Sequence, residues 1–117
     1  MNASLNSKIN AESSSPASHV LEMVIMGAGF GGLAMAIRML QQGRKDFVVL
    51  EKASDVGGTW RENTYPGAAC DVQSHMYSFS FAPKADWTKR YAERPEIYNY
   101  IQETTDKFGL RDYIQFN

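Results

Sequence analysis

The stretch Gly27-Ala28-Gly29-Phe30-Gly31-Gly32 decides the fold class, because it follows a mostly apolar run at residues 20–26 (Val-Leu-Glu-Met-Val-Ile-Met). An apolar run of that length, closed by glycine, predicts a strand buried on both faces. Residues 47–50 (Phe-Val-Val-Leu) predict a second strand, which ends at Glu51. Between the two runs, apolar residues recur at the spacing of one helix face, at Leu33, Ala36, Ile37 and Leu40.

Strand, glycine turn, helix and strand within about 30 residues make a βαβ unit. Its sheet is expected to be parallel and its crossover right-handed, and Gly43 stands where the helix is expected to end. We therefore predict an α/β, Rossmann-like fold with a three-layer core over residues 20–117, incomplete at its C-terminal end.

The three spaced glycines predict a dinucleotide site. Gly27 permits the tight turn, Gly29 leaves room for a pyrophosphate, and Gly32 lets the helix pack against the strand. The pyrophosphate is expected at the N-terminus of the helix that follows. Glu51 comes about 20 residues later, where a carboxylate accepts hydrogen bonds from ribose hydroxyls and repels a 2′-phosphate. These residues suit the adenosine of FAD or NAD rather than NADP, and they leave the choice between FAD and NAD open.

A second glycine-rich segment, Gly57-Gly58-Thr59-Trp60, is followed by Tyr65-Pro66-Gly67 and then by Asp71. Its two glycines would let the backbone pass close to a bound dinucleotide. The Trp60 ring offers a flat apolar wall that keeps a reactive centre dry. Taken singly, Trp60 is equally typical of a core and Asp71 of a turn or a helix N-cap. Their joint spacing favours a cofactor site.

In these two segments the chain resembles the class B flavoprotein monooxygenases and, among them, the Baeyer–Villiger monooxygenases. That family carries Gly-Gly-x-Trp, an aromatic-Pro-Gly and an Asp at the spacing found from Gly57 to Asp71, and every fixed position matches. The resemblance continues through Tyr77-Ser78-Phe79-Ser80 and Pro95-Glu96-Ile97 and covers residues 20–117.

The resemblance implies the FAD-binding N-terminal portion of an NADPH-using monooxygenase. In that family, NADPH reduces FAD, O₂ adds to the reduced flavin, and the adduct converts a small-molecule ketone into an ester or lactone. Related members oxygenate nitrogen or sulfur. The resemblance also implies a catalytic role for Asp71, whose counterpart holds an arginine from the later NADPH-binding region, and a place near the flavin for Tyr77. The residues expected at the cofactor are Gly27, Gly29, Phe30, Gly32, Glu51, Lys52, Gly58, Thr59, Trp60, Asp71 and Tyr77.

The family's NADPH-binding glycine motif and its His-containing fingerprint do not occur in these 117 residues. We therefore expect no turnover by this chain alone, and use of NADPH only with a C-terminal part, which a separate polypeptide could supply. Three alternatives stay open. One is an N- or S-oxygenating flavin monooxygenase or other FAD oxidoreductase, the second is a truncated, non-catalytic FAD-binding fragment, and the third is an NAD-binding module.

The remainder of the chain carries weaker patterns. Residues 52–66 are rich in turn residues and predict a loop, whereas residues 77–81 alternate and predict an extended segment with one aromatic face. Pro95 is expected in the first turn of a helix that Gly109 closes. The apolar stripe of that helix comprises Ile97, Ile101 and Phe108, and residues 113–116 predict a last strand.

Other conspicuous side chains are expected to serve the fold. Cys70 is interpreted as a small packing residue near the cofactor. His75 has no second ligand-like residue nearby, so no metal site is expected. A solvated charged face is expected from Asp86, Lys89, Arg90, Glu93 and Arg94.

Composition argues against several function classes. The net charge of −1 gives no field that calls for nucleic acid or an anionic membrane. The single cysteine cannot form an intramolecular disulfide, and no apolar run approaches the roughly 20 residues of a membrane span. Residues 1–19 are rich in Ser and Asn, and we expect a disordered leader rather than a secretory signal. The cytoplasm is therefore the default location.

Overall fold

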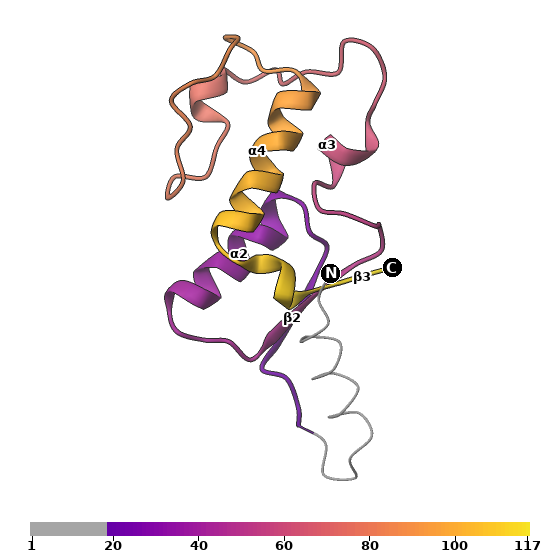
Figure 1. Cartoon of the computed structure of the whole chain (residues 1–117), viewed down its shortest axis with the longest axis vertical. Coiled ribbons are helices and arrows are strands. Elements are labelled where there is room, and N and C mark those ends of the chain that lie inside the picture. The colour runs from indigo at the N-terminus through magenta and orange to yellow at the C-terminus, as the bar shows by residue number, and fades with distance from the viewer. Residues whose placement is uncertain (1–18) are drawn as a thin grey trace.

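The computed structural model describes residues 19–117 (Figure 1), and the expected disordered leader lies, apart from His19, outside the described residues. Three strands and three α-helices make up the described part. They are, in chain order, β1 (Met23–Met26), α2 (Phe30–Gln41), β2 (Phe47–Glu51), α3 (Thr59–Glu62), α4 (Arg94–Lys107) and β3 (Ile114–Phe116). There are also two 3₁₀ turns. The turn η1 (Ser74–Met76) precedes residues 77–81, and η2 (Leu110–Tyr113) precedes β3.

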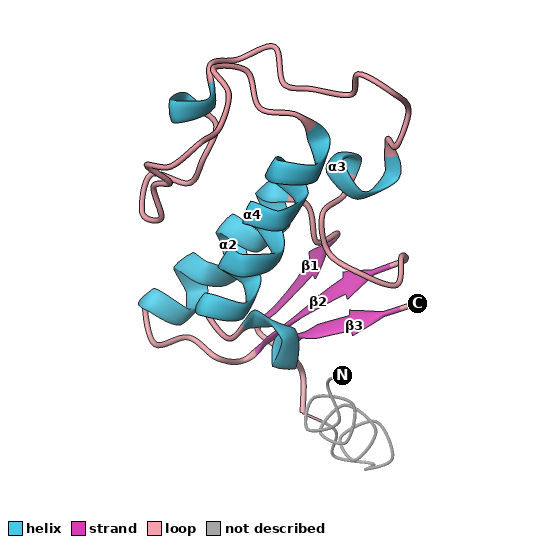
Figure 2. Ribbon diagram, turned by 45° about the horizontal axis from the view of Figure 1, so that its top comes forward, coloured by secondary structure: helices cyan, strands magenta, loops and turns pink. Residues whose placement is uncertain are grey.

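The strands form one parallel sheet in the order β1-β2-β3 (Figure 2). Met23 is opposite Phe47 in the first pair, and Val49 is opposite Ile114 in the second. The βαβ unit that the sequence predicts is therefore present, with its second strand at the predicted residues.

The core lies between the sheet and the helices. Side chains alternate across a strand, so that Ile25, Val49 and Ile114 share the face turned toward the helices, where all three are buried. They meet the apolar stripes of α2 and α4, whose members Leu33, Ile37, Ile97 and Ile101 are fully buried. Burying each such side chain stabilises the fold by about 1.5–3 kcal/mol.

The prediction of a three-layer core is wrong for the described residues. Both α2 and α4 lie on the same face of the sheet (Figure 2). The reason is topological, because two right-handed crossovers that advance in one direction across a sheet place their helices on one side. The opposite face includes Val24 and Met26 of β1, whose side chains are 49% and 78% exposed.

The segment between β2 and α4 departs most from the sequence prediction. Residues 77–81 are not extended but follow η1 in turns, with the Tyr77 N–H donating to Ser74 O and the Ala82 N–H to Phe79 O. Among the described residues this segment pairs with no strand, and its aromatic rings pack against the core instead. The loop expected at residues 52–66 contains the single-turn helix α3.

The predicted helix boundaries are confirmed at three places. Pro95 lies in the first turn of α4, and the positive φ angles of Gly43 (72°) and Gly109 (65°) end α2 and α4. Searched over residues 19–117, the helices include none that is long and apolar enough to span a membrane.

Candidate cofactor site

The turn from β1 into α2 is built so tightly that only glycine fits at its last position. Gly27 has a φ of 94°, and its N–H donates to Leu50 O at 2.8 Å, which joins the turn to β2. A Cβ atom on Gly32 would lie 1.9 Å from Gly27 O. This is the close approach of helix and turn that the glycine spacing requires.

Glu51 is locked in place at the carboxyl end of β2. Its side chain is buried, with Oε2 accepting a hydrogen bond from the Ala28 N–H at 2.8 Å and Oε1 from the Ala53 N–H at 2.9 Å. A carboxylate has about four acceptor positions, so two remain for other donors. Glu51 thus presents a fixed acceptor beside the glycine turn.

The two glycine-rich segments meet at this place. The Gly57 N–H donates to Ala28 O at 2.9 Å. Gly58, with a φ of 53°, approaches the first turn so closely that a Cβ atom on it would lie 3.3 Å from Gly29 Cα. A side chain at Gly29 or Gly58 would fill the space between the segments.

Around this contact lies a cavity of about 260 Å³, at the carboxyl ends of β1 and β2. Ligands of open α/β sheets bind at this position. The cavity is lined by Met26, Gly27, Ala28, Gly29, Leu50, Glu51, Lys52, Gly58 and Glu62.

The N-terminus of α2 adjoins the same turn. No side chain caps this helix, and its first turn contains no acidic residue. The first helical hydrogen bond runs from the Leu33 N–H to Gly29 O, at 3.0 Å. The amides before Leu33 have no acceptor within the helix, and together with the helix dipole they favour an anion.

Three aromatic side chains continue the site beyond Gly29. The Phe30 and Tyr77 rings meet edge to face with centroids 5.2 Å apart, and the Trp60 and Tyr77 rings do so at 5.7 Å. The Trp60 indole Nε1–H also donates to the Tyr77 hydroxyl at 3.1 Å. A second cavity, of about 270 Å³, is lined by Phe30, Met76, Tyr77 and Ser78.

The predicted site residues therefore fall into two groups and a remainder. Gly27, Gly29, Glu51, Lys52 and Gly58 line one cavity, and Phe30 and Tyr77 line the other, with Trp60 bonded to Tyr77. Gly32 packs beneath the turn.

Thr59 begins α3 with an exposed side chain, and Asp71 is exposed in a bend; neither lines these two cavities. The neighbouring Cys70 is buried, and its Sγ accepts a hydrogen bond from the Val72 N–H.

The expectation of a solvated role for Arg94 is wrong. Its guanidinium donates to Trp60 O at 2.7 Å and to Arg61 O at 2.9 Å. The last carbonyl groups of a helix lack hydrogen-bond partners within it. In the short α3, the Arg94 side chain is the donor to these carbonyl groups. Sequence reasoning also missed Asp55, a hydrogen-bond acceptor two residues before Gly57. No local pattern marks these contacts, because the bonds of Arg94 to Trp60 and of Tyr98 to Asp55 join residues 34 and 43 positions apart.

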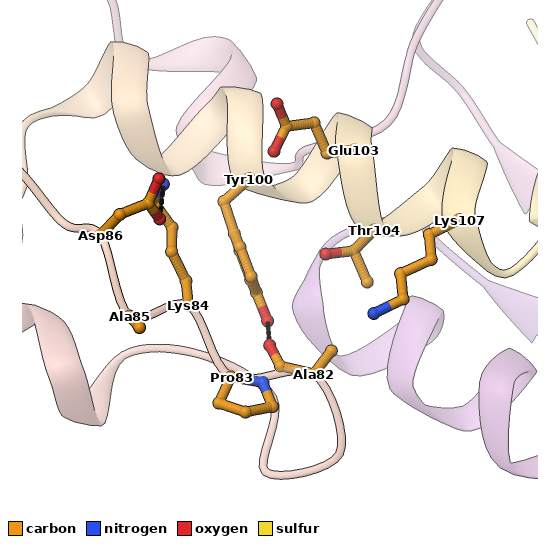
Figure 3. A pocket seen from close by; sticks show the side chains of 9 residues that line it. All are labelled: Ala82, Pro83, Lys84, Ala85, Asp86, Tyr100, Glu103, Thr104 and Lys107. Carbon is orange, nitrogen blue, oxygen red and sulfur yellow. Dashed lines mark hydrogen bonds and ion pairs between the residues drawn. The ribbon is translucent and has the colours of Figure 1, made fainter.

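A third cavity, of about 300 Å³, lies between α4 and the loop at residues 82–86 (Figure 3). Lys84 pairs with Asp86 at 2.8 Å, and the Tyr100 hydroxyl donates to Ala82 O at 2.6 Å. None of its lining residues belongs to the glycine-rich segments. Over residues 19–117, no group of three or more His, Cys, Asp or Glu side chains is placed to hold a metal ion.

Comparison with known proteins agrees with this geometry. Residues 25–94 match the family described as NAD(P)-binding Rossmann-like domain. The chain is 50% identical over 97 residues to a Baeyer-Villiger monooxygenase of Streptomyces coelicolor, covering 83% of this chain and 19% of that protein. It is 42% identical over 113 residues to the FAD-binding monooxygenase tazF of Aspergillus terreus, covering 94% of this chain and 20% of that protein.

Solved structures show the same relationship. The oxidized steroid monooxygenase bound to NADP superposes with a TM-score of 0.75 at 44% identity, over 80% of this chain and 18% of that chain. The chain thus spans about a fifth of the length of its relatives. It belongs to the NAD(P)-binding Rossmann-like domain family, and its sequence is similar to the N-terminal part of Baeyer–Villiger monooxygenases.

Proposed function

We propose that this chain binds FAD, as the N-terminal portion of an NADPH-using flavin monooxygenase of the Baeyer–Villiger type. The observation that carries the proposal is the buried Glu51 carboxylate. It is hydrogen-bonded to the first glycine turn, at the point where Gly29 and Gly58 leave room for a ligand. The names of relatives such as the FAD-binding monooxygenase of A. terreus support this choice of cofactor.

Each part of the site fits one part of FAD. The Glu51 carboxylate would accept the ribose hydroxyls of the adenosine half. The N-terminal amides of α2 would hold the pyrophosphate, with the Lys52 ammonium at the same cavity. The flavin half would extend past Gly58 toward Trp60 and Tyr77, which provide an aromatic wall and exclude water. Bound FAD supplies the redox and oxygen chemistry, while the protein holds and orients it.

The aromatic group distinguishes FAD from NAD as the ligand. Glu51 disfavours a 2′-phosphate, which leaves both FAD and NAD compatible with the first cavity. The second cavity lies beside Phe30 and Tyr77, and this apolar, aromatic surface suits an isoalloxazine ring better than a nicotinamide. For the whole enzyme we propose conversion of a small ketone into an ester or lactone. Asp71 is proposed as a residue near the flavin, and oxygenation at nitrogen or sulfur is the second candidate reaction.

The test is a titration of the purified chain with FAD and with NAD⁺, followed by flavin absorbance and by quenching of FAD fluorescence. We expect saturable binding of FAD and none of NAD⁺ at equal concentration. Glu51→Gln places an amide N–H₂ among backbone donors, and we expect FAD affinity to fall about tenfold. Asp112→Asn is the control, because it removes one negative charge at an exposed position that lines neither cavity, and it should leave FAD affinity unchanged. A folded wild-type chain that binds no FAD would overturn the proposal.

A further inference from the structure

Helix α4 turns a polar stripe toward the second glycine-rich segment. Arg94, Tyr98 and Gln102 follow one another at i, i+4 spacing, which places them on one helix face. Each donates side-chain hydrogen bonds to residues 55–61, the segment that carries Gly57, Gly58 and Trp60.

The first contact holds α3. The Arg94 guanidinium reaches the backbone oxygens of Trp60 and Arg61, at 2.7 and 2.9 Å. It also lies over the Tyr98 ring, 4.8 Å from the ring centroid. The positive charge of Arg94 therefore interacts both with the two backbone oxygens of α3 and with the Tyr98 ring.

The second contact holds Gly57. The Tyr98 ring lies so close that a Cβ atom on Gly57 would be 2.8 Å from the ring carbon Cε1. The Tyr98 hydroxyl donates to Asp55 Oδ2 at 2.9 Å. Gly57 is therefore packed from one side by α4 and bonded on the other, through its N–H, to Ala28 O.

The third contact gathers several donors on Asp55. Besides Tyr98, Gln102 Nε2 donates to its Oδ2 at 3.0 Å, and Arg111 Nη1 to its Oδ1 at 3.1 Å. The Val56 N–H donates to Oδ1 at 2.8 Å. Asp55 is only 26% exposed, so these bonds are partly shielded from water.

We propose that Asp55, Arg94, Tyr98 and Gln102 form a clamp, here called the α4 clamp, that positions Gly57, Gly58 and Trp60 for FAD. None of the four lines the two candidate cofactor cavities, so they are positioning residues and not catalytic ones. The inference rests on the proposed function and adds to it how the second segment is held.

The need for such a clamp follows from the segment itself. A helix as short as α3 is not stable alone, and consecutive glycines have large backbone freedom that ordering must overcome. A binding segment held in its bound conformation beforehand does not spend ligand binding energy on that ordering. The clamp therefore acts on FAD affinity through the order of residues 57–61.

The test compares Asp55→Asn and Tyr98→Phe with Asp106→Asn as the matched control. Asp106 is the other carboxylate of Arg111, bonded to its Nε at 2.6 Å, and does not contact the segment. Two quantities are measured for each chain, namely the dissociation constant for FAD and the hydrogen exchange of the amides at residues 57–61 and in β2. Tyr98→Phe keeps the ring on Gly57, so it carries the test should Asp55→Asn fail to fold.

We expect both clamp variants to weaken FAD binding about tenfold and to speed exchange at residues 57–61 while β2 keeps its protection. The control should change neither quantity. Unchanged FAD affinity and unchanged exchange in both variants would overturn the clamp even where the wild-type chain binds FAD. If the wild-type chain binds no FAD, the proposed function is wrong. Hydrogen exchange then tests the clamp by itself, and equal exchange rates of the amides at residues 57–61 in all chains would contradict it.

Discussion

At Gly32, a single added methyl group would meet the backbone of the turn beneath it. The clash is with Gly27 O at 1.9 Å, and backbone atoms cannot move aside as a flexible side chain can. We expect Gly32→Ala to lower the free energy of unfolding by about 3 kcal/mol, measured by urea denaturation. Gly31→Ala is the control, because Gly31 is also in α2 and a Cβ atom there meets nothing within 4 Å. It should be neutral or stabilising by up to about 1 kcal/mol, and equal losses in both variants would contradict the packing argument.

The charge of Asp55 predicts a pH dependence of stability. Burial alone would raise the pKa of Asp55, but the donors Val56, Tyr98, Arg111 and Gln102 outweigh it and hold that pKa below its ordinary value. Other charged groups near these donors are Arg61 and Arg94 beside Tyr98, and Asp106 beside Arg111. A lowered carboxyl pKa gives stability that is fully present above the ordinary value of about 3.9 and is lost as the pH falls through the folded-state pKa.

We therefore expect wild-type protein to exceed Asp55→Asn in the free energy of unfolding by about 1 kcal/mol at pH 7. The difference should shrink steadily in urea titrations carried out below about pH 4. A difference that stays constant down to pH 2.5 would show that the Asp55 charge is not what the surrounding donors stabilise.

At the scale of the element, the end of α4 depends on one backbone conformation. Gly109 has φ 65° and ψ 33°, the left-handed region, and lies in open space. We expect Gly109→Ala to cost about 1 kcal/mol through backbone strain alone, as read from the thermal midpoint. Gly109→Asn should cost clearly less, since Asn tolerates this region better. Equal losses for Ala and Asn would point to a cause other than the backbone angle.

Elements whose signals are local were predictable from the sequence. The strands β2 and β3, helix α2 and the ends of α4 follow from apolar periodicity and from Gly and Pro at their boundaries. Residues 77–81 show the opposite case. Their alternation is that of a strand, but a strand also needs a partner, and the Phe79 N–H instead donates to the Tyr100 hydroxyl at 2.9 Å.

The candidate site, too, was predictable from the sequence only in part. The glycine turn and Glu51 were recognisable, because a turn, a helix start and a strand end fix their relation within one βαβ unit. The α4 clamp was not, because its bonds join residues 34 and 43 positions apart, and the bond from Asp55 to Arg111 spans 56. A charged residue in a polar stretch shows no sequence signal for the distant carbonyl groups that it meets in the fold.

At the scale of the whole molecule, the sheet has an edge at β1 where no described strand follows. Apolar side chains accompany this edge, with Met26 78% exposed, and unpaired strand edges promote association. We expect the chain to self-associate as its concentration rises, measured by sedimentation velocity. Met26→Lys should weaken the association, whereas Met76→Lys, at a similarly exposed position in η1, should not. A single monomeric boundary at all concentrations would contradict this expectation.

The parallel arrangement also brings the last residues of the sheet to the cofactor cavity. Phe116 is opposite Glu51 in the register, and the Asn117 N–H donates to Ala53 O at 3.3 Å. A dye coupled behind residue 117 would therefore lie near the mouth of that cavity. Resonance energy transfer between such a dye and bound flavin would therefore report flavin occupancy.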